Sequence, residues 1–322
     1  MTPIGSRSTG SRVPSALDEV QTEGQVNAPE DDFCDALAES RVAILGLGLM
    51  GGSLALALRG HCAELLGVDP DPETLALAEQ MGLVDRLAVD PAELLPQADL
   101  VVLAAPVRAI IRLLGALPDQ HPGRAVVLDL GSTKVEITRA MAHLPDRFEP
   151  VGGHPMCGKE RSSLLQAEAR LYQGAPFAFS ATPGTTPRAR GLAEALARAV
   201  GANPLWLEPE THDRWVAATS HLPYLVACAL AAATPAEVGP LVGPGFRSTT
   251  RLAASPASVM LDILTTNRAN LLEALQRFRT SLDQIEACLT GPEGGAELAQ
   301  ALNRGAERQN QLVGQPVAGG KR

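Results

Sequence analysis

Residues 42–53 read VAILGLGLMGGS and join a short apolar run to a closely spaced set of glycines. Gly46, Gly48 and Gly51 stand in G-x-G-x-x-G spacing, directly before the helical stretch LALALRG. A strand, a tight glycine turn and a helix in that order are typical of a dinucleotide-binding βαβ unit. The glycines let the backbone approach a pyrophosphate, which the N–H groups at the start of the helix hold. The alternative is a purely structural turn, because glycine-rich turns are common.

An acidic residue ends the next apolar run. The stretch LLGVD places Asp69 about twenty residues after the glycines, where a carboxylate accepts hydrogen bonds from an adenosine ribose and repels the 2′-phosphate of NADP. The following residues, VDPDPET, offer no arginine for such a phosphate. The pattern therefore favours NAD. The alternative is that Asp69 is only a turn residue in its Asp-Pro-Asp-Pro stretch.

Composition limits the classes of protein to consider. The 322 residues carry a net charge of −9, and 45% are hydrophobic but only 3% aromatic, which suits one or two globular domains with aliphatic cores. The acidic balance does not fit a nucleic-acid partner. Five scattered cysteines without a C-x-x-C pair indicate reduced thiols in a cytoplasmic protein, with neither a disulfide framework nor a metal site. The longest apolar run, residues 222–233, is too short to predict a membrane span.

The order of strand-like and helical patterns predicts two domains between two tails. Residues 1–39 are rich in small, polar and acidic residues and are predicted to be a disordered tail. Over residues 40–209, apolar β-type runs alternate with helical runs such as 72–81, 107–117 and 134–143. The predicted strands are VAILGL, LLGVD, DLVVLAAPV, AVVLDLGS, EPVGGHP, PFAFSA and NPLWLE. This alternation predicts an α/β, Rossmann-type, mostly parallel sheet with helices on both faces.

Beyond residue 209 the strand signal stops. The remaining pattern predicts an all-helical substrate and dimerisation domain over residues 210–305, followed by a frayed C-terminal tail over 306–322. Its expected helices span 212–234, 256–265 and 267–289, with a Pro/Gly-rich connection at 235–245. We expect the ligand in the cleft between the two domains.

Three predicted strand ends carry residues suited to a site, and ligands of open α/β sheets bind at these ends. The third strand ends in Ala105 and Pro106, which are small and uncharged and allow a cofactor to pass over them. The next two strands end in Ser132 and His154. A neutral imidazole beside the nicotinamide accepts a hydroxyl proton as hydride leaves the same carbon. The alternatives are that Ser132 caps the following helix and that His154 is a hydrogen-bonded core residue.

The helical part adds cationic residues. Arg247 and Arg251 are four residues apart and share a face if their segment is helical. Two guanidinium groups facing a cleft suit a substrate with two carboxylates. A solvated helix face is the alternative for both arginines. His221 stands in an otherwise apolar helix, where the alternative is a core or interface histidine.

Six segments occur in an order and at spacings that resemble the prephenate dehydrogenase family. They are GLGLMGGS, DLGSTK, VGGHPMCGKE, THD, ATSHLP and GPGFRSTTRLA, and the similarity covers about residues 41–288. The resemblance implies NAD-dependent oxidative decarboxylation of prephenate to 4-hydroxyphenylpyruvate in tyrosine biosynthesis. It also implies a Rossmann-type domain followed by a helical domain that builds a homodimer, with no fused regulatory domain.

The resemblance also implies roles for individual residues. Ser132 and His154 match the family's hydroxyl-binding pair, with His154 bonded to the ring hydroxyl, and Arg251 matches the arginine that binds the ring carboxylate. The expected cofactor-binding residues are Gly46, Gly48, Leu49, Met50, Gly51, Asp69, Ala105, Pro106 and Ser132.

Other matches are looser. His221 and Arg247 match positions near the substrate side chain, Glu160 a residue that gates the pocket, and Asp213 an acid near the domain junction. Two departures concern the shape of the pocket. Arg247 stands where some relatives carry lysine, and Met260 where a tryptophan is often found.

Three other functions remain open from the sequence. Arogenate differs from prephenate only in carrying an ammonium in place of the keto group, and no residue decides between the two. A 3-hydroxy acid dehydrogenase needs a lysine base in the helical domain, and the helix around His221 offers none. A non-catalytic NAD-binding protein is the third reading, against which Ser132, His154 and Arg251 argue.

Overall fold

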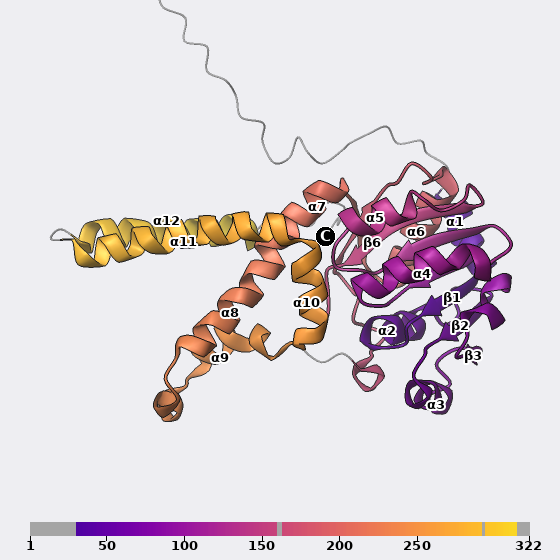
Figure 1. Cartoon of the computed structure of the whole chain (residues 1–322), viewed down its shortest axis with the longest axis horizontal. Coiled ribbons are helices and arrows are strands. Elements are labelled where there is room, and N and C mark those ends of the chain that lie inside the picture. Colours follow the sequence, from indigo (N-terminus) through magenta and orange to yellow (C-terminus); the bar gives the residue numbers. More distant parts are fainter. Residues whose placement is uncertain (1–29, 160–162, 292–293, 314–322) are drawn as a thin grey trace, which may run out of the picture.

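The computed structural model describes residues 30–159, 163–291 and 294–313. A sheet domain and a helical domain lie end to end (Figure 1). Glu160 and the outer parts of the two expected tails, residues 1–29 and 314–322, lie outside the described residues.

The first domain is built on one sheet of eight strands in the order β3-β2-β1-β4-β5-β6-β7-β8. Neighbours are parallel from β3 to β6, β7 is antiparallel to β6, and β8 is parallel to β7. The strands are β1 (Arg41–Leu45), β2 (Glu64–Val68), β3 (Arg86–Ala88), β4 (Leu100–Leu103), β5 (Ala125–Asp129), β6 (Phe148–Pro155), β7 (Pro176–Ser180) and β8 (Asn203–Trp206). The predicted mostly parallel sheet is confirmed. The sequence misses β3, because three residues at the end of a sheet show no periodicity.

The strand order places a ligand site at one point of the sheet. β1 lies between β2 and β4, so the chain continues to one side of β1 and later returns to its other side. Crevices at the carboxyl ends of strands form at such a reversal. The glycine turn follows β1 there, and Ser132 and His154 lie at the carboxyl ends of β5 and β6.

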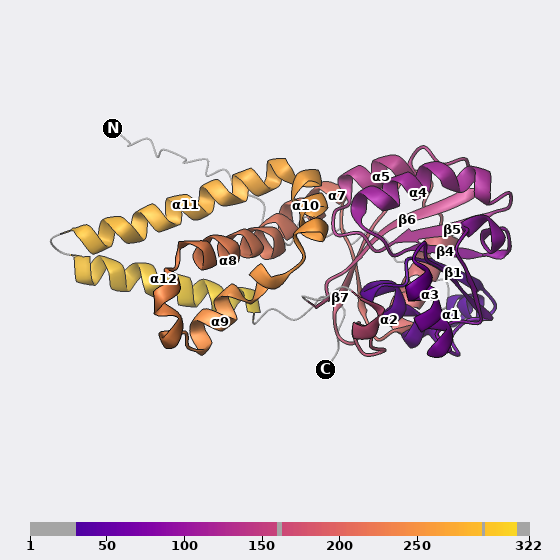
Figure 2. The ribbon, with the colours of Figure 1, turned by 60° about the horizontal axis from the view of Figure 1, so that its bottom comes forward.

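Helices cover both faces of the sheet (Figure 2). One face is covered by α1 (Glu30–Ala38), α2 (Leu49–Leu58), α3 (Pro72–Gln80) and α6 (Pro187–Ala199), and the other by α4 (Val107–Gln120) and α5 (Val135–Met141). Every residue of β5 is buried, because the strand has helices above and below it. This explains why the strands show apolar runs rather than alternation.

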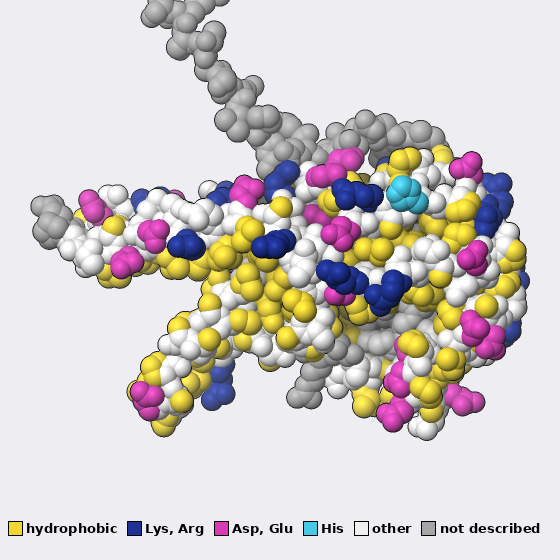
Figure 3. All heavy atoms as spheres, in the orientation of Figure 1, with side chains coloured by type: hydrophobic (Ala, Val, Ile, Leu, Met, Phe, Trp, Pro, Cys, Tyr) yellow, Lys and Arg dark blue, Asp and Glu magenta, His cyan; other side chains and the backbone are white. Residues whose placement is uncertain are grey.

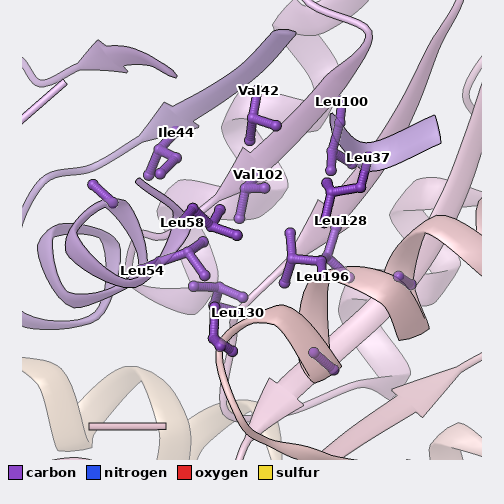
Figure 4. Packing of buried hydrophobic residues seen from close by; sticks show 14 of the residues in the cluster. Leu37, Val42, Ile44, Leu54, Leu58, Leu100, Val102, Leu128, Leu130 and Leu196 are labelled. Atoms are coloured by element: carbon purple, nitrogen blue, oxygen red, sulfur yellow. The ribbon is translucent and has the colours of Figure 1, made fainter. Parts of the chain in front are cut away.

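Aliphatic side chains form the core on the first face (Figure 4). Val42 and Ile44 of β1, Val102 of β4 and Leu54 and Leu58 of α2 are all 0% exposed. Each such side chain contributes roughly 1.5–3 kcal/mol when it leaves water. This packing fixes β1 and α2, and with them the turn that joins the two elements.

The structure differs from the predicted N-terminal tail over its last part. The sequence predicts disorder up to residue 39, whereas Glu30–Ala38 form α1. Leu37 is 2% exposed, and the ring of Phe33 lies where a side chain on Gly191 of α6 would stand. A helix this short depends on tertiary packing, which its polar composition does not reveal.

The second domain contains only helices among its described residues. They are α7 (Pro209–Val216), η4 (Ala217–His221), α8 (Leu222–Ala233), η5 (Ala236–Leu241), α9 (Pro244–Thr250), η6 (Arg251–Ala254), α10 (Ala257–Thr266), α11 (Arg268–Thr290) and α12 (Gly294–Val313). α11 and α12 run in opposite directions and lie close at the end of the molecule far from the sheet domain, and Figure 2 shows that they diverge from there. The sequence predicts fraying after residue 305, but α12 continues as a helix to Val313, with the side chains of residues 302–313 exposed.

One helix of this domain is longer than the sequence indicates. α7, η4 and α8 continue from one to the next, and the 25 residues of Pro209–Ala233 include an 18-residue window with a mean hydropathy of 1.5, long and apolar enough to span a membrane. The expectation that no segment reaches this length was therefore wrong. Length and composition are weak support for a membrane span, because Thr211, His212 and Asp213 at its start are buried at the domain junction.

α10 joins the two domains. Ile263 is 8% exposed and packs into the core on the α4 face of the sheet. The Asp262 carboxylate lies 3.3 Å from the Arg108 guanidinium of α4, and the hydroxyls of Thr266 and Thr133 are 3.0 Å apart. These contacts fix the helical domain over the carboxyl ends of the strands.

Candidate active site

The glycine turn has the geometry that its spacing predicts. Gly46 has φ +98°, and a Cβ there would lie 2.4 Å from the Ala104 carbonyl oxygen. A Cβ on Gly51 would lie 1.8 Å from the Gly46 carbonyl oxygen. Gly48 begins α2 without a side-chain cap, so no capping side chain competes for the N–H groups of the first turn. A phosphate fits such a helix end.

Asp69 holds this turn in place. One carboxylate oxygen accepts the Leu47 N–H at 2.7 Å and the other accepts the Asp71 N–H at 2.9 Å, and the residue is 9% exposed. The turn-residue interpretation therefore describes part of what Asp69 does. Its contact with a ribose stays a prediction.

A cleft of about 690 Å³ lies between the glycine turn and the helical domain. Eight of the expected site residues line it: Gly48, Leu49, Met50, Ala105, Pro106, Ser132, His154 and Arg251. Gly46, Gly51 and Asp69 shape the turn without lining this cleft. His221 and Arg247 are also absent from its walls, and Met260 is present.

A π-helical turn shapes the helical wall of the cleft. Leu222 donates its N–H to the carbonyl of Ala217, five residues earlier, within η4. Thr219 and Ser220 of this turn line the cleft, and Tyr224 lies on the same wall. Single π-turns are frequent at functional sites. Pro223 is the sequence signal for it, since a proline disturbs the carbonyl four residues before it.

His221 lies inside the domain. Its side chain is 1% exposed, and its Nδ1 lies 3.2 Å from the Asn267 side-chain nitrogen, which also donates to the Asp213 carbonyl at 2.6 Å. Burial lowers the pKa of His221 to about 4, so its ring is neutral near pH 7. This geometry fits a core or interface histidine, which is the alternative that the sequence allows for His221.

The two arginines have different surroundings. Arg247 lies in α9 with an exposed side chain away from the cleft walls, whereas Arg251 begins η6 and lines the cleft. Lys159 is a second cation on the cleft wall, and its ammonium lies 3.1 Å from Glu168. A ligand with negative groups would thus meet Arg251 and Lys159 rather than Arg247.

His154 is half-buried at the cleft wall and connects to two buried groups, His212 and Asp213. Its Nδ1 lies 2.9 Å from Nε2 of His212, and Nδ1 of His212 lies 2.8 Å from the Asp213 carboxylate. Asp213 also accepts the backbone N–H groups of Lys134 at 2.7 Å and Val135 at 3.0 Å. Burial first, and then the neighbouring His212 and Lys134 side chains, lower the pKa of His154 well below 6.5. A neutral imidazole at the cleft wall is suited to accept a proton.

A buried ion pair fixes the strand ends beneath His154. The Lys134 ammonium contacts the Asp129 carboxylate and the Gly153 carbonyl, and both side chains are 0% exposed. Asp129 also accepts the N–H groups of Gly131 at 2.7 Å and Gly153 at 3.0 Å. Burial raises the pKa of Asp129 and lowers that of Lys134, and their contact opposes both shifts. The ends of β5 and β6 are thereby joined.

Sequence reasoning did not single out His212 or Lys134 as site residues. Both lie in segments that carry the family resemblance, THD and DLGSTK, and both are polar residues that the fold buries. Buried polar groups require partners, but the sequence does not identify which partners. Within the described residues no group of three His, Cys, Asp or Glu side chains is arranged to hold a metal ion.

Comparison with known proteins agrees with this geometry. A family model described as the prephenate dehydrogenase nucleotide-binding domain matches residues 54–203, and one described as the prephenate dehydrogenase dimerization domain matches residues 208–304. The chain belongs to the prephenate dehydrogenase family. The prephenate dehydrogenase of Bacillus subtilis is 31% identical over 256 residues, which is 76% of this chain and 68% of the relative.

Solved structures of the family have the same architecture. The prephenate dehydrogenase of A. aeolicus, solved with hydroxyphenyl propionate and NAD+, has a TM-score of 0.79 and 30% identity, over 86% of this chain and 99% of that one. The arogenate dehydrogenase of Synechocystis has a TM-score of 0.72 and 29% identity, over 84% and 99% of the two chains. The expected family and the Rossmann-type plus helical fold are therefore confirmed.

Proposed function

We propose that this chain is an NAD-dependent prephenate dehydrogenase, which converts prephenate to 4-hydroxyphenylpyruvate and carbon dioxide. The observation that carries the proposal is the composition of the cleft. Ser132 and His154 line it from the strand ends, Arg251 lines it from the helical domain, and the start of α2 forms its edge. Membership of the prephenate dehydrogenase family supports the same substrate.

The residues present fit the cofactor. Side chains at Gly46 and Gly51 would collide with the backbone, so the turn keeps a surface on which a pyrophosphate can lie close to the start of α2. Gly48, Leu49 and Met50 would hold the phosphates, and Ala105 and Pro106 would lie beneath the nicotinamide side of the cofactor. When bound, NAD supplies a hydride acceptor.

The protein's own groups account for the rest of the chemistry. His154 accepts the proton of the ring hydroxyl while hydride leaves the same carbon, and Ser132 donates a hydrogen bond to that oxygen. Arg251 orients the ring carboxylate. The bond from the ring to this carboxylate then breaks, its electron pair completes the aromatic ring as carbon dioxide leaves, and the ring oxygen takes back the proton from His154. Aromatisation makes the overall reaction strongly downhill.

NAD preference rests on Asp69. A 2′-phosphate about 4 Å from this carboxylate would be repelled by about 1–4 kcal/mol, or roughly fivefold to a thousandfold in kcat/KM. Steady-state rates with NAD and NADP test this preference, and equal or better efficiency with NADP would contradict it.

Arogenate is the second candidate substrate, favoured by the similarity to the Synechocystis arogenate dehydrogenase. The decisive experiment is an assay of the purified full chain with NAD and either prephenate or arogenate. Formation of reduced cofactor is followed by absorbance and the product is identified by mass spectrometry. We expect turnover with prephenate to 4-hydroxyphenylpyruvate. Turnover with arogenate but not prephenate would show that arogenate is the substrate. Binding of NAD without turnover of either compound would contradict the proposal.

We further propose a homodimer in the cytoplasm, with no nucleic-acid or membrane partner. The second family model is described as a dimerization domain, and the helices it covers expose Leu230, Leu261, Leu272 and Leu282 at 38%, 62%, 54% and 47%. In Figure 3 hydrophobic side chains gather over these helices. All five cysteines are free thiols, as suits a reducing compartment.

A further inference from the structure

Buried hydrogen bonds fix which nitrogens of His212 and His154 carry hydrogen. Asp213 receives the N–H groups of Lys134 and Val135, at 2.7 and 3.0 Å, as well as the His212 ring. A carboxylate only accepts hydrogen bonds, and two backbone N–H groups already point at this one. His212 must therefore present an N–H at Nδ1, and in a neutral ring this leaves a lone pair at Nε2.

The same reasoning extends to the cleft. Nδ1 of His154 lies 2.9 Å from Nε2 of His212, and the two rings meet edge to face with an angle of 69° between their planes. Since Nε2 of His212 accepts, Nδ1 of His154 must donate. A neutral His154 then has its lone pair at Nε2, the only ring nitrogen left to accept a proton from a ligand in the cleft.

We propose that His212, anchored by Asp213, is a positioning residue that holds His154 in the Nδ1–H tautomer. In this tautomer Nε2 of His154 receives the hydroxyl proton of the substrate. The proposal rests on the proposed function for the identity of the proton donor. A His212 ring with its hydrogen at Nε2 would instead donate to His154, which would then carry its own hydrogen at Nε2 and could not act as the base.

The charges around the pair support this arrangement. The titratable and charged groups that act on the two rings are Lys134, Asp129, Asp213 and His221. Burial lowers the pKa of His212, and Asp213 opposes this shift. When His154 takes a proton it becomes an imidazolium, and its charge is then stabilised through the His212 ring by the Asp213 carboxylate, as in a triad.

Two substitutions of His212 separate positioning from structure. In His212→Leu the side chain keeps a similar bulk but has no acceptor for the His154 N–H. In His212→Gln the amide oxygen can still accept that N–H. We expect His212→Leu to lower kcat by roughly a hundredfold to ten-thousandfold, with the KM values for prephenate and NAD changed by less than about threefold. His212→Gln should recover a large part of the loss in kcat.

His121→Gln is the matched control. His121 is a buried histidine of the sheet domain, 2% exposed, with its Nε2 2.9 Å from the Ala98 carbonyl and no contact with the cleft. Its substitution should lower the thermal midpoint without changing kcat. If His212 were merely structural, His212→Leu would behave in the same way as His121→Gln.

The tautomer can be measured without substrate. In protein with 15N-labelled histidine, the ring-nitrogen chemical shift distinguishes a protonated nitrogen from one with a lone pair, and His154→Asn identifies the His154 signals. We expect a protonated Nδ1 and a lone pair at Nε2 of His154 in the wild type and His212→Gln. In His212→Leu the proton should move to Nε2, which unconstrained imidazole prefers.

The measurements distinguish the possible failures. A wild-type His154 that carries its hydrogen on Nε2 would overturn the proposal, and so would a His212→Leu variant with unchanged tautomer and wild-type kcat. Absence of turnover by the wild type with prephenate and with arogenate would contradict the proposed function. The tautomer measurement would still decide the role of His212.

Discussion

At the scale of single residues, His154 is the group on which the chemistry depends. In His154→Asn the side chain stays polar but the base is gone, so kcat should fall by roughly a hundredfold to ten-thousandfold. NAD affinity, measured by calorimetry without substrate, should stay within a few-fold. A variant that kept most of its kcat would show that another group takes the proton.

The pH profile of the wild type tests the same residue. His154 acts as a base only when neutral, and burial first, then the neighbouring His212 and Lys134 side chains, lower its pKa well below 6.5. The rate should therefore stay constant as the pH falls through 6.5 and decrease only at lower pH. If the rate falls over the same low-pH range in the wild type and in His154→Asn, the titrating group is not His154.

Arg251 should act on substrate binding. Removing one partner of a charge pair that the bound substrate buries costs about 2–5 kcal/mol, so Arg251→Ala should lose roughly thirtyfold to several thousandfold in kcat/KM, mainly through KM. Arg251→Lys should recover only part of the lost kcat/KM, because an ammonium does not reproduce the bidentate contact of a guanidinium. Arg247→Ala is the control, since Arg247 does not line the cleft. An Arg251→Ala variant with a normal KM would place Arg251 outside the substrate site.

At the scale of elements, the Lys134–Asp129 pair joins the ends of β5 and β6. Both side chains are 0% exposed, and breaking a buried pair by removing one partner costs about 3–5 kcal/mol. Lys134→Met should therefore lower the free energy of unfolding by that amount in urea denaturation. The double variant Lys134→Met/Asp129→Asn should be less destabilised than the sum of its two singles by about 0.5–3 kcal/mol. Additive effects would show that the two groups do not interact.

Sequence patterns predict some helices and strands of this chain and miss others. The strands around Val42 and Val126 are apolar runs with helices on both faces, and local composition is enough to predict them. α1 has a polar composition and forms because it packs on α6. The last turns of α12 are also helical, but their side chains are exposed. The π-turn of η4 reorients Thr219 and Ser220, which no helical periodicity of 3.6 predicts.

At the scale of the whole molecule, the helical domain should bind a second copy. Light scattering at micromolar concentration should give the mass of a dimer. Leu272→Glu with Leu282→Glu places charges on two leucines of α11 that are 54% and 47% exposed, and should shift the equilibrium toward monomer. Leu165→Glu, on a leucine of the sheet domain that is 72% exposed, is the control and should stay dimeric. A monomeric wild type would contradict the proposed assembly.

Buried His221 should also make the stability of the fold sensitive to acid. The pKa of His221 is about 4 in the folded protein against 6.5 as its reference value, so the unfolded chain binds more protons between these pH values. The contribution to stability is therefore complete above pH 6.5 and is lost as the pH falls to about 4, by roughly 3 kcal/mol. His221→Gln should lose less stability than the wild type between pH 7 and pH 4 in urea denaturation. Identical losses would show that His221 is protonated in the folded state.

The sequence alone predicts the order of the domains, seven of the eight strands, the glycine turn and the position of His154 at a strand end. These features depend on local backbone geometry and on short apolar runs, which neighbouring residues encode. Only the tertiary structure decided which polar residues meet. His154 and His212 are 58 positions apart and Lys134 and Asp213 are 79 apart, and the cleft takes Arg251 but not Arg247. Such contacts depend on how α7, η6 and α10 pack on the strand ends. This packing joins residues that are far apart in the chain, so local sequence patterns do not predict it.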